Sequence, residues 1–296
     1  MRVLIVGCGY LGLPLGAELV RQGHEVFGLR RSATDELKSA GITPLIADIT
    51  APETLTSLPR DFDWVVNCAA SGGGSADDYR QLYLQGTRNL IEWLAAAPPK
   101  KFVYTSSTSV YGQNDGSLVK ETSPTEPQAE SAKVLVETEK VLLTAALEKN
   151  FPAVILRVAG IYGPDRGHWF KQFLADEARI EGKGDRFLNM IHRDDLVGVI
   201  IAALKSGRAG EIYNAVDDEP VSHFKFFEWL AASLDKPMPP VTPEDAEVDR
   251  KRGVTNKKVS NRRLKMELGY QFKHPTFRQG YTAELIRLDR AAPPAN

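Results

Sequence analysis

An α/β fold with a doubly wound parallel sheet and a smaller C-terminal lobe is the architecture that this sequence of 296 residues predicts. Short apolar strands alternate with helical patterns through the first 165 residues. A glycine-rich turn joins the first strand to the first helix. Beyond Pro164 the alternation gives way to polar turns, helices and isolated short strands. The first two observations predict a core of the Rossmann type, and the third predicts a lobe added to it.

The N-terminal segment has the order strand, glycine turn, helix, strand. Its elements are Val3–Val6, the glycines Gly7, Gly9 and Gly12, an apolar helix from Leu11 to Val20, and a strand from Glu25 to Leu29. We expect Gly7 to permit the tight turn, Gly9 to let the backbone approach a pyrophosphate, and Gly12 to let the helix pack on the strand. Tyr10 and Leu11 lie in the same turn, where free N–H groups favour an anion. This pattern predicts a dinucleotide site.

The end of the second strand indicates which dinucleotide binds. A site that prefers NAD usually has Asp or Glu there, to accept hydrogen bonds from the ribose 2′-hydroxyl. Here no carboxylate occurs from Val26 to Ser32, and the strand runs into Arg30, Arg31 and Ser32. Two guanidiniums suit a 2′-phosphate, so we predict NADP(H) as the cofactor. A solvated basic turn is the alternative interpretation.

The ends of the next strands supply further candidate cofactor contacts. The third strand, 43–47, runs into Asp48 and Ile49. Asp48 is expected either to bind the adenine amino group or to cap the segment after Thr50, and both interpretations remain open. The fourth strand, 63–67, opens into a run of small residues, Cys68, Ala69, Ala70, Ser71 and Gly72–Gly74, which would let the backbone lie against the cofactor.

The second half of the predicted core repeats the β-α pattern. It comprises a helix over 76–97, a strand over 101–105, a helix over 129–148 and a strand over 153–157. Ser106 and Val158, which follow these two strands directly, complete the predicted cofactor site. Residues 1–165 are therefore assigned to the NADP-binding core, with returning elements at about 186–216, and residues 166–296 mainly to the lobe. The two long helices are where we expect a homodimer to form.

Composition limits the function classes. With 43% hydrophobic residues, 25% charged residues and a net charge of −1, the chain resembles an ordinary globular protein without a field that attracts nucleic acid. We find no signal-peptide pattern and no apolar run long enough for a membrane span, and therefore expect a cytoplasmic protein without a membrane partner. Cys8 and Cys68 have neither metal-ligand nor disulfide spacing, so no metal is predicted. Buried inert cysteines are expected, with a redox-sensing thiol as the alternative.

The segment after Pro243 is rich in basic residues. It includes Lys251-Arg252 and Asn256-Lys257-Lys258. Such a patch is usually a solvated surface, and the alternative is that it faces a phosphate or carboxylate on a substrate.

Four motifs together resemble the extended short-chain dehydrogenase/reductases of the NAD-dependent epimerase/dehydratase type. They are GCGYLG, FVYTSSTSVYG, LRVAGIYGPDRG and IHRDDL, in that order and at suitable spacings. The resemblance implies a Rossmann core, a C-terminal lobe that binds a small-molecule substrate, and a Tyr-x-x-x-Lys pair with a nearby Ser. In that family the tyrosine exchanges a proton with the substrate oxygen while hydride moves to or from nicotinamide.

The resemblance assigns Ser107 to the serine position and Lys133 to the lysine position, where it also binds the nicotinamide ribose. Counting back four residues from Lys133 gives Ala129, not tyrosine. A methyl group cannot transfer a proton. Tyr111 is therefore grouped with Ser107 and Lys133 as a catalytic candidate.

Three further candidates are Tyr83, Tyr162 and His192, and the residues alone do not select among the four. The segment that contains His192, IHRDDL, is expected rather to fasten the lobe to the core.

Two functions follow from this pattern. The first is an NADP-dependent oxidoreductase, or an epimerase/dehydratase-like enzyme, that acts on a hydroxyl or carbonyl substrate such as a nucleotide sugar. The second is an NADP-binding sensor or scaffold protein with little or no catalysis, which the alanine at position 129 favours.

Overall fold

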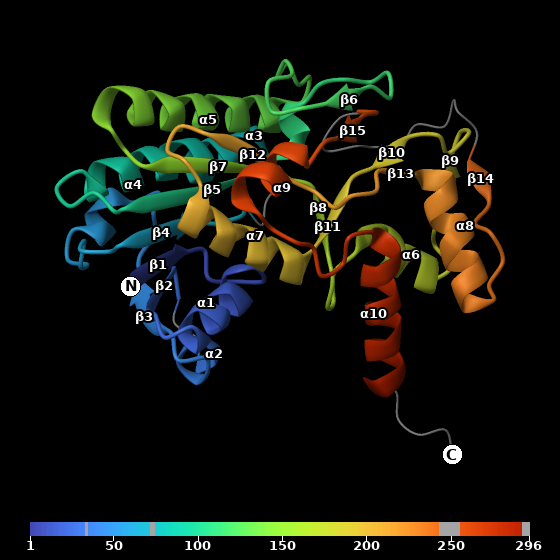
Figure 1. The fold of residues 1–296 in the computed structure, drawn as a ribbon, viewed down its shortest axis with the longest axis horizontal. Helices are drawn as coiled ribbons and strands as arrows, with labels where there is room; N and C mark the ends of the chain where they lie inside the picture. The colour runs from blue at the N-terminus through green and yellow to red at the C-terminus, as the bar shows by residue number, and fades with distance from the viewer. Residues whose placement is uncertain (33–34, 72–74, 243–254, 292–296) are drawn as a thin grey trace.

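A seven-stranded parallel sheet forms the centre of the protein in the computed structural model, which describes residues 1–32, 35–71, 75–242 and 255–291 (Figure 1). The strand order is β12-β7-β5-β4-β1-β2-β3. The strands are β1 (Arg2–Val6), β2 (Glu25–Arg30), β3 (Thr43–Ile46), β4 (Trp64–Asn67), β5 (Lys101–Ser107), β7 (Ala153–Val158) and β12 (Ile212–Ala215). The predicted doubly wound α/β class is thus confirmed.

The strand order reverses beside β1. The chain proceeds from β1 to β2 and β3 on one side, and then crosses to β4 and β5 on the other. Val6, the last residue of β1, pairs with Leu29 of β2 and with Asn67 of β4. Ligands of doubly wound sheets bind outside the carboxyl ends of the strands at such a reversal. The fold therefore places the glycine turn at the expected binding position.

Helices cover both faces of the sheet. One face packs against α1 (Gly12–Arg21), α2 (Asp35–Ser39) and α7 (Arg193–Ser206), and the other against α4 (Gly86–Leu94) and α5 (Glu130–Lys149). Figure 1 shows α5 and α1 on opposite sides of the strands. Because both faces are covered, the central strands are almost entirely apolar; β4, for example, is buried along its whole length.

The predicted helix over 76–97 is more irregular than its pattern suggested. It begins as α3 (Ala76–Tyr79), continues as a π-helical segment, η2 (Arg80–Gln85), and ends as α4 at Leu94. A π-helical segment shifts the buried face of a helix, a change that apolar spacing alone does not reveal.

Helix α6 of the lobe spans His168–Leu174. It stops because Asp176 adopts a left-handed conformation, with φ of 59°.

The C-terminal lobe has its own hydrophobic core. Phe226 and Phe227 of α8 (His223–Leu234) pack there with Tyr162 and with Phe277 of α10 (Phe277–Ala291). Short paired strands complete the lobe: β8 (Gly160–Tyr162) with β11 (Met190–His192), β9 (Ile180–Glu181) with β14 (Val241–Thr242), and β10 (Phe187–Leu188) with β13 (Val221–Ser222).

A further short strand pair connects the segment after η3 with the segment before α9. Strand β6 (Leu118–Val119) pairs with β15 (Lys258–Val259), and α9 (Arg262–Leu268) follows. Short 3-10 turns lie at η1 (Pro52–Leu55) and η3 (Thr108–Val110). Within the described part of the chain, no helix has the length and apolar character that a bilayer span requires.

Candidate cofactor and substrate site

The three glycines of the first turn have distinct environments. Gly7 has φ of +86°, and a Cβ there would lie 2.4 Å from the Cα atom of Ala69. A Cβ on Gly12 would lie 2.7 Å from the carbonyl oxygen of Gly7 and 3.0 Å from Ile5. A Cβ on Gly9, in contrast, would meet no described atom within 4 Å. Gly7 and Gly12 are therefore required by the fold itself, whereas Gly9 borders open space.

The N-terminus of α1 has donors available beside that space. Leu11 precedes the helix, and no hydrogen bond from a side chain caps this end among the described residues. The first N–H groups of a helix lack intrahelical partners, and the dipole adds positive potential there. This end of α1 suits an anionic group such as a pyrophosphate.

Separate substitutions at Gly9 and Gly12 should distinguish the two roles. Gly9→Ala places a methyl group in the open space, so we expect an unchanged unfolding temperature and an affinity for dinucleotide lowered about tenfold or more. Gly12→Ala should instead lower the free energy of unfolding by about 1–3 kcal/mol, because its methyl group overlaps Gly7 and Ile5. Thermal unfolding and fluorescence titration with NADPH measure both effects. Unchanged affinity in a folded Gly9→Ala variant would contradict a ligand at this turn.

Two arginines missed by the sequence interpretation lie beside the same turn. The guanidiniums of Arg166 and Arg193 lie 5.0 and 5.4 Å from the centre of the Tyr10 ring. They come from the turn after β8 and from the first residue of α7, within the motifs LRVAGIYGPDRG and IHRDDL. Their positive charge adds to the potential that favours an anion at the helix N-terminus.

The end of β2 places a positive charge near the glycine turn. Arg30 is half-buried, while Arg31 and Ser32 are exposed. Burial raises the pKa of the Cys8 thiol to about 11, and the charge of Arg30 opposes this rise. Arg30 therefore lies close enough to act on the turn electrostatically.

Burial also raises the pKa of the Cys68 thiol, as it does that of Cys8, so both thiols are kept protonated and unreactive at neutral pH.

Asp48 and Ile49 follow β3. The Oδ1 atom of Asp48 accepts hydrogen bonds from the backbone N–H (2.9 Å) and the hydroxyl (2.8 Å) of Thr50. The carboxylate thus caps the turn before η1, as one of the two interpretations expected. Ile49 is buried, and its carbonyl oxygen accepts a hydrogen bond of 2.7 Å from the amide of Asn89. Its side chain packs toward α4.

The residues after β4 lie against the glycine turn. Cys68 donates its backbone N–H to Val6, and Ala69 is the close neighbour of Gly7. Ala70 is exposed beside them. The expected glycine loop at 72–74 and the basic pair Lys251-Arg252 lie outside the described residues.

Ser107 and Ser106 have different environments at the end of β5. The Ser107 hydroxyl accepts a hydrogen bond of 3.1 Å from the N–H of Ser109 and so caps η3, while the residue stays partly accessible. Ser106 is buried, and its hydroxyl donates to Glu139 at 2.6 Å. Val158 is also buried, and it pairs with Ser107 across β5 and β7. Of the two serines, only Ser107 has a partly accessible side chain.

Tyr111 belongs to a buried polar network. Its hydroxyl donates to Asn214 at 2.7 Å and accepts from Arg157 at 2.9 Å. Arg157 in turn forms a buried ion pair with Glu139, at 2.7 Å. Burial raises the pKa of Tyr111 despite the nearby guanidinium. Both hydrogen-bonding positions of the hydroxyl are in use, so we assign Tyr111 a structural role instead of the catalytic one suggested by its motif.

The N-terminus of α5 contains the two positions of the Tyr-x-x-x-Lys pair, of which only the lysine is present. Ala129 is the residue before the helix and has no side-chain group to cap it. Lys133 lies one turn further on and forms an ion pair of 2.6 Å with Glu130, with about half of its side chain exposed. The helix packs against η3, the turn that Ser107 caps.

Tyr83 and Tyr162 are occupied or buried elsewhere. The hydroxyl of Tyr83 accepts a hydrogen bond of 3.2 Å from the N–H of Ser71. Tyr162 is buried in the lobe, where its ring stacks on Tyr281 at 4.3 Å between centroids. Burial raises the pKa of Tyr162, so its hydroxyl stays protonated at neutral pH.

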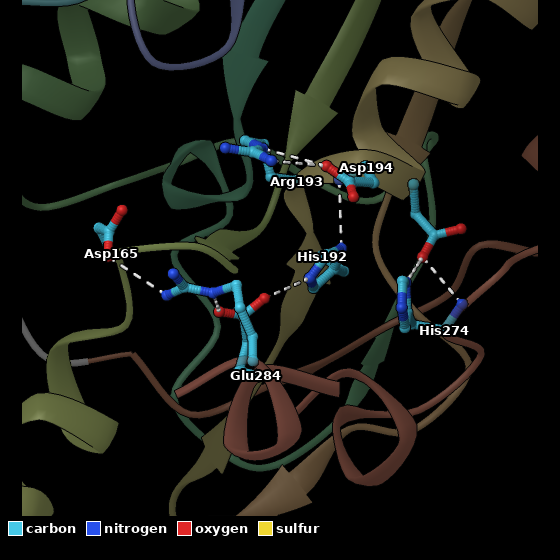
Figure 2. A network of polar contacts seen from close by, with 8 residues as sticks. Asp165, His192, Arg193, Asp194, His274 and Glu284 are labelled. Atoms are coloured by element: carbon cyan, nitrogen blue, oxygen red, sulfur yellow. Dashed lines mark hydrogen bonds and ion pairs between the residues drawn. The ribbon is translucent and has the colours of Figure 1, made fainter. Parts of the chain in front are cut away.

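His192 lies at the junction of core and lobe (Figure 2). Its Nδ1 atom accepts a hydrogen bond from the N–H of Asp194 at 3.2 Å, and its Nε2 atom faces Glu284 of α10 at 3.4 Å. The first contact assigns the proton to Nε2, which therefore donates to Glu284. Burial lowers the pKa of His192, with the neighbouring His274 adding to the effect. The ring fastens α7 to α10, in agreement with the role expected for IHRDDL.

Asp195 fastens the same junction to the segment before α10. Its carboxylate accepts hydrogen bonds from the Tyr270 hydroxyl (2.9 Å), the Lys273 N–H (2.6 Å), and the backbone N–H and ring Nδ1–H of His274 (2.9 Å each). His192, Asp195 and His274 lie close enough to share an ion. Hydrogen bonds already use both carboxylate oxygens of Asp195 and both ring nitrogens of His192. We therefore assign this cluster a structural role, connecting α7 to the segment before α10, and not a metal site.

The fold is a doubly wound α/β core with a C-terminal lobe, and a glycine turn lies at the reversal of its strand order. The sequence pattern of the NAD dependent epimerase/dehydratase family matches residues 3–215, and the chain belongs to this family. The resemblance inferred from the four motifs is thereby confirmed.

Individual relatives agree over nearly the whole chain. Protein YeeZ of Escherichia coli K12 is 29% identical over 286 residues, which cover 93% of this chain and 96% of YeeZ. A solved structure from Methylobacillus flagellatus, provisionally described as an NAD-dependent epimerase/dehydratase, is 34% identical with a TM-score of 0.77, and covers 97% of this chain and 98% of that one.

A more distant solved structure is DesIV, a dTDP-glucose 4,6-dehydratase from Streptomyces venezuelae with NAD and TYD bound. It superposes with a TM-score of 0.83 at 23% identity and covers 98% of this chain and 97% of that one. At this identity the likeness concerns the fold alone.

Proposed function

We propose that the protein is an NADP(H)-dependent oxidoreductase that interconverts a hydroxyl and a carbonyl group on a small-molecule substrate. The observation that supports this most directly is the glycine turn, where Gly9 borders open space at an uncapped helix N-terminus. The adjoining β2 ends in Arg30 and Arg31 with no carboxylate between Val26 and Ser32. An anionic dinucleotide with a 2′-phosphate fits both features.

The residues present fit each part of such a cofactor. The turn from Gly7 through Tyr10 and Leu11 to Gly12 would hold the pyrophosphate, and Arg30, Arg31 and Ser32 the 2′-phosphate. The adenine would lie near Asp48 and Ile49, and the riboses along Cys68–Ala70. Ser107 and Lys133 would orient the substrate oxygen and the nicotinamide ribose. When bound, the nicotinamide supplies or accepts the hydride.

Arg30 and Arg31 should set the preference for NADPH. In the Arg30→Ala/Arg31→Ala double variant we expect the dissociation constant for NADPH to rise by tens-fold or more, because each charge-assisted contact contributes about 1.5–3 kcal/mol. The dissociation constant for NADH, which has no 2′-phosphate, should change little and serves as the internal control. Calorimetric titration of both dinucleotides measures the two constants. An equal loss of affinity for NADPH and NADH would show that these arginines do not recognise the 2′-phosphate.

Turnover is tested by the absorbance of reduced nicotinamide with a panel of aldehydes, ketones and nucleotide sugars. The expected result is NADPH oxidation with at least one carbonyl compound. Nucleotide sugars are in the panel because the family includes enzymes that act on them. We also propose that the protein forms a homodimer through the helical segments 76–97 and 129–148.

A second candidate function rests on Ala129. A protein that binds NADPH tightly but lacks a proton carrier would sense the cofactor state or act as a scaffold. Tight NADPH binding together with inactivity across the whole panel would support this second function instead of the first.

A further inference from the structure

Arg166 carries a guanidinium that no carboxylate neutralises in the described part of the chain. The residue is exposed, and its side chain forms neither an ion pair nor a hydrogen bond with any described group. The carboxylates on the neighbouring segments already have cations of their own (Figure 2). These pairs are Asp165–Arg287 (3.2 Å), Glu284–Arg287 (2.9 Å) and Asp194–Arg193 (3.0 Å). The N–H donors of the Arg166 guanidinium therefore remain available for an anion.

A tight turn after β8 fixes the backbone of Arg166. Arg166 and Gly163 exchange two backbone hydrogen bonds, of 3.0 and 3.1 Å, and Asp165 between them has φ of 58°. A Cβ on Gly163 would lie 3.1 Å from the Nε2 atom of His192 and 3.3 Å from the Cβ atom of Arg193. The turn is therefore packed against the start of α7, and Arg166 projects from a defined place on the lobe.

The guanidinium of Arg166 lies over the glycine turn of the core. Its central carbon is 5.0 Å from the centre of the Tyr10 ring. Tyr10 stands between Gly9, which borders open space, and Leu11, which precedes the uncapped end of α1. A guanidinium over an aromatic ring uses its face for that contact, and its N–H groups, which lie in its plane, stay free for an anion.

Arg193, the second arginine over the Tyr10 ring, has fewer donors to offer. Its Nε and Nη2 atoms contact the Oδ1 atom of Asp194 at 3.1 and 3.0 Å, and its side chain is 21% exposed. The charge of Arg193 still adds to the positive potential at the turn. Arg166 is therefore the residue of this pair that can bind a ligand directly.

The anion that fits this position is a pyrophosphate. The glycine turn offers backbone N–H groups and a helix dipole, which amounts to only about half an elementary charge. A pyrophosphate carries negative charge on both phosphates, so these donors leave part of its charge without compensation. Arg30 and Arg31 stand at the end of β2, where we place the 2′-phosphate. Arg166 supplies a full charge and a planar donor set at the turn itself.

We propose that Arg166 is a further cofactor-binding residue, whose guanidinium pairs with the pyrophosphate of the dinucleotide from the side of the lobe; this inference rests on the proposed function. The glycine turn then holds the pyrophosphate from the core side. A Cβ on Gly167, the next residue, would lie 3.1 Å from the hydroxyl of Tyr281 in α10. Because this turn packs on α10 as well as on α7, a bound dinucleotide connects the core with the lobe.

The test measures dissociation constants by calorimetric titration for NADPH, NADH and adenosine 2′-monophosphate, which has no pyrophosphate. Arg166→Ala should raise the constants of NADPH and NADH by the same factor, about 10- to 100-fold, because both lose one charge-assisted contact. The constant of adenosine 2′-monophosphate should stay within about twofold of wild type. The Arg30→Ala/Arg31→Ala variant should show the reverse pattern, with weaker binding of NADPH and adenosine 2′-monophosphate and little change for NADH.

Arg179→Ala is the matched control. Arg179 is an exposed arginine of the same lobe, and its guanidinium donates to the carbonyl oxygen of Ala178 at 2.8 Å. This variant loses the same charge without a described contact to the glycine turn, so all three constants should be kept. Arg166→Lys keeps a positive charge but lacks the planar donor set, and should show an intermediate loss. Thermal unfolding without ligand should be unchanged in all of these lobe variants, because both arginines are exposed.

The outcomes separate this inference from the proposed function. Unchanged NADPH and NADH constants in Arg166→Ala would overturn the inference while the proposed function stands. A loss confined to NADPH would also overturn it, since Arg166 would then recognise the 2′-phosphate. An equal loss in Arg179→Ala would reduce the effect to the general charge of the lobe and would overturn it as well. A wild type that binds neither dinucleotide would overturn both the inference and the proposed function.

Discussion

Glu139→Ala is expected to lower the free energy of unfolding by about 3–5 kcal/mol, a large fraction of the total stability of a typical protein. Glu139 accepts hydrogen bonds from Arg157 and Ser106, and the side chains of Glu139 and Arg157 are 3% and 5% exposed. Removal of the carboxylate leaves a buried guanidinium with no counter-charge, and desolvation makes that state costly. The fall in the free energy of unfolding should therefore exceed the net contribution that the ion pair makes to stability.

Glu137→Ala is the matched control on the same helix. Glu137 pairs with Arg80 at 2.8 Å, but about half of each side chain is exposed. Exposed ion pairs contribute about 0–1 kcal/mol, so this variant should unfold near the wild-type denaturant midpoint. Urea unfolding followed by circular dichroism measures both variants. Similar midpoints for the two would show that the network around Arg157 contributes little to stability.

Asp195→Asn is expected to cost about 3 kcal/mol of unfolding free energy at pH 7. The Asp195 carboxylate accepts four hydrogen bonds, two of them from the backbone N–H groups of Lys273 and His274. An asparagine side chain has one acceptor oxygen and turns an NH2 group toward donors on its other side. The segment that leads into α10 would therefore lose its attachment to α7.

The same variant should change the pH dependence of stability. Burial on its own would raise the pKa of Asp195, but hydrogen bonds from His274, Lys273 and Tyr270 outweigh it and lower the pKa. Because the folded-state pKa lies below the unfolded value of about 3.9, the carboxylate stabilises the fold above that value and loses its effect as pH falls.

The stability difference between wild type and Asp195→Asn should thus shrink from pH 7 to pH 3. Thermal unfolding across this range measures it, with Asp194→Asn as the control, because Asp194 is only partly buried. A difference that is constant with pH would mean that the carboxylate charge is not what matters.

The parts of the protein that the sequence predicts well are those determined by local chemistry. The positive φ of Gly7, the close packing of Gly12 and the open side of Gly9 follow from a turn that must fit between a strand and a helix. The alternation of apolar strands and helices is enough to predict the parallel sheet. The glycine turn at the end of β1 belongs to this group.

The parts that could not be predicted depend on contacts between distant segments. The sequence groups Tyr111 with the catalytic candidates, but its hydroxyl is used by Asn214, 103 positions away. Ser106 and Ser107 are adjacent in sequence, and only the fold shows that one is buried against Glu139 while the other caps η3. Lys257 stands in a basic stretch that reads as surface, and nothing local indicates that it is buried.

The place of β12 at the edge of the main sheet, beside β7, determines how the protein can be divided. The 53 residues between these strands, 159–211, build much of the lobe before the chain returns to the sheet. A fragment that ends at residue 165 would therefore lose α7 and the edge strand, and would expose the backbone of β7 to pairing with other chains. The lobe is built from one stretch of chain before β12 and another after it, so neither part is expected to be obtained intact by one cut of the polypeptide.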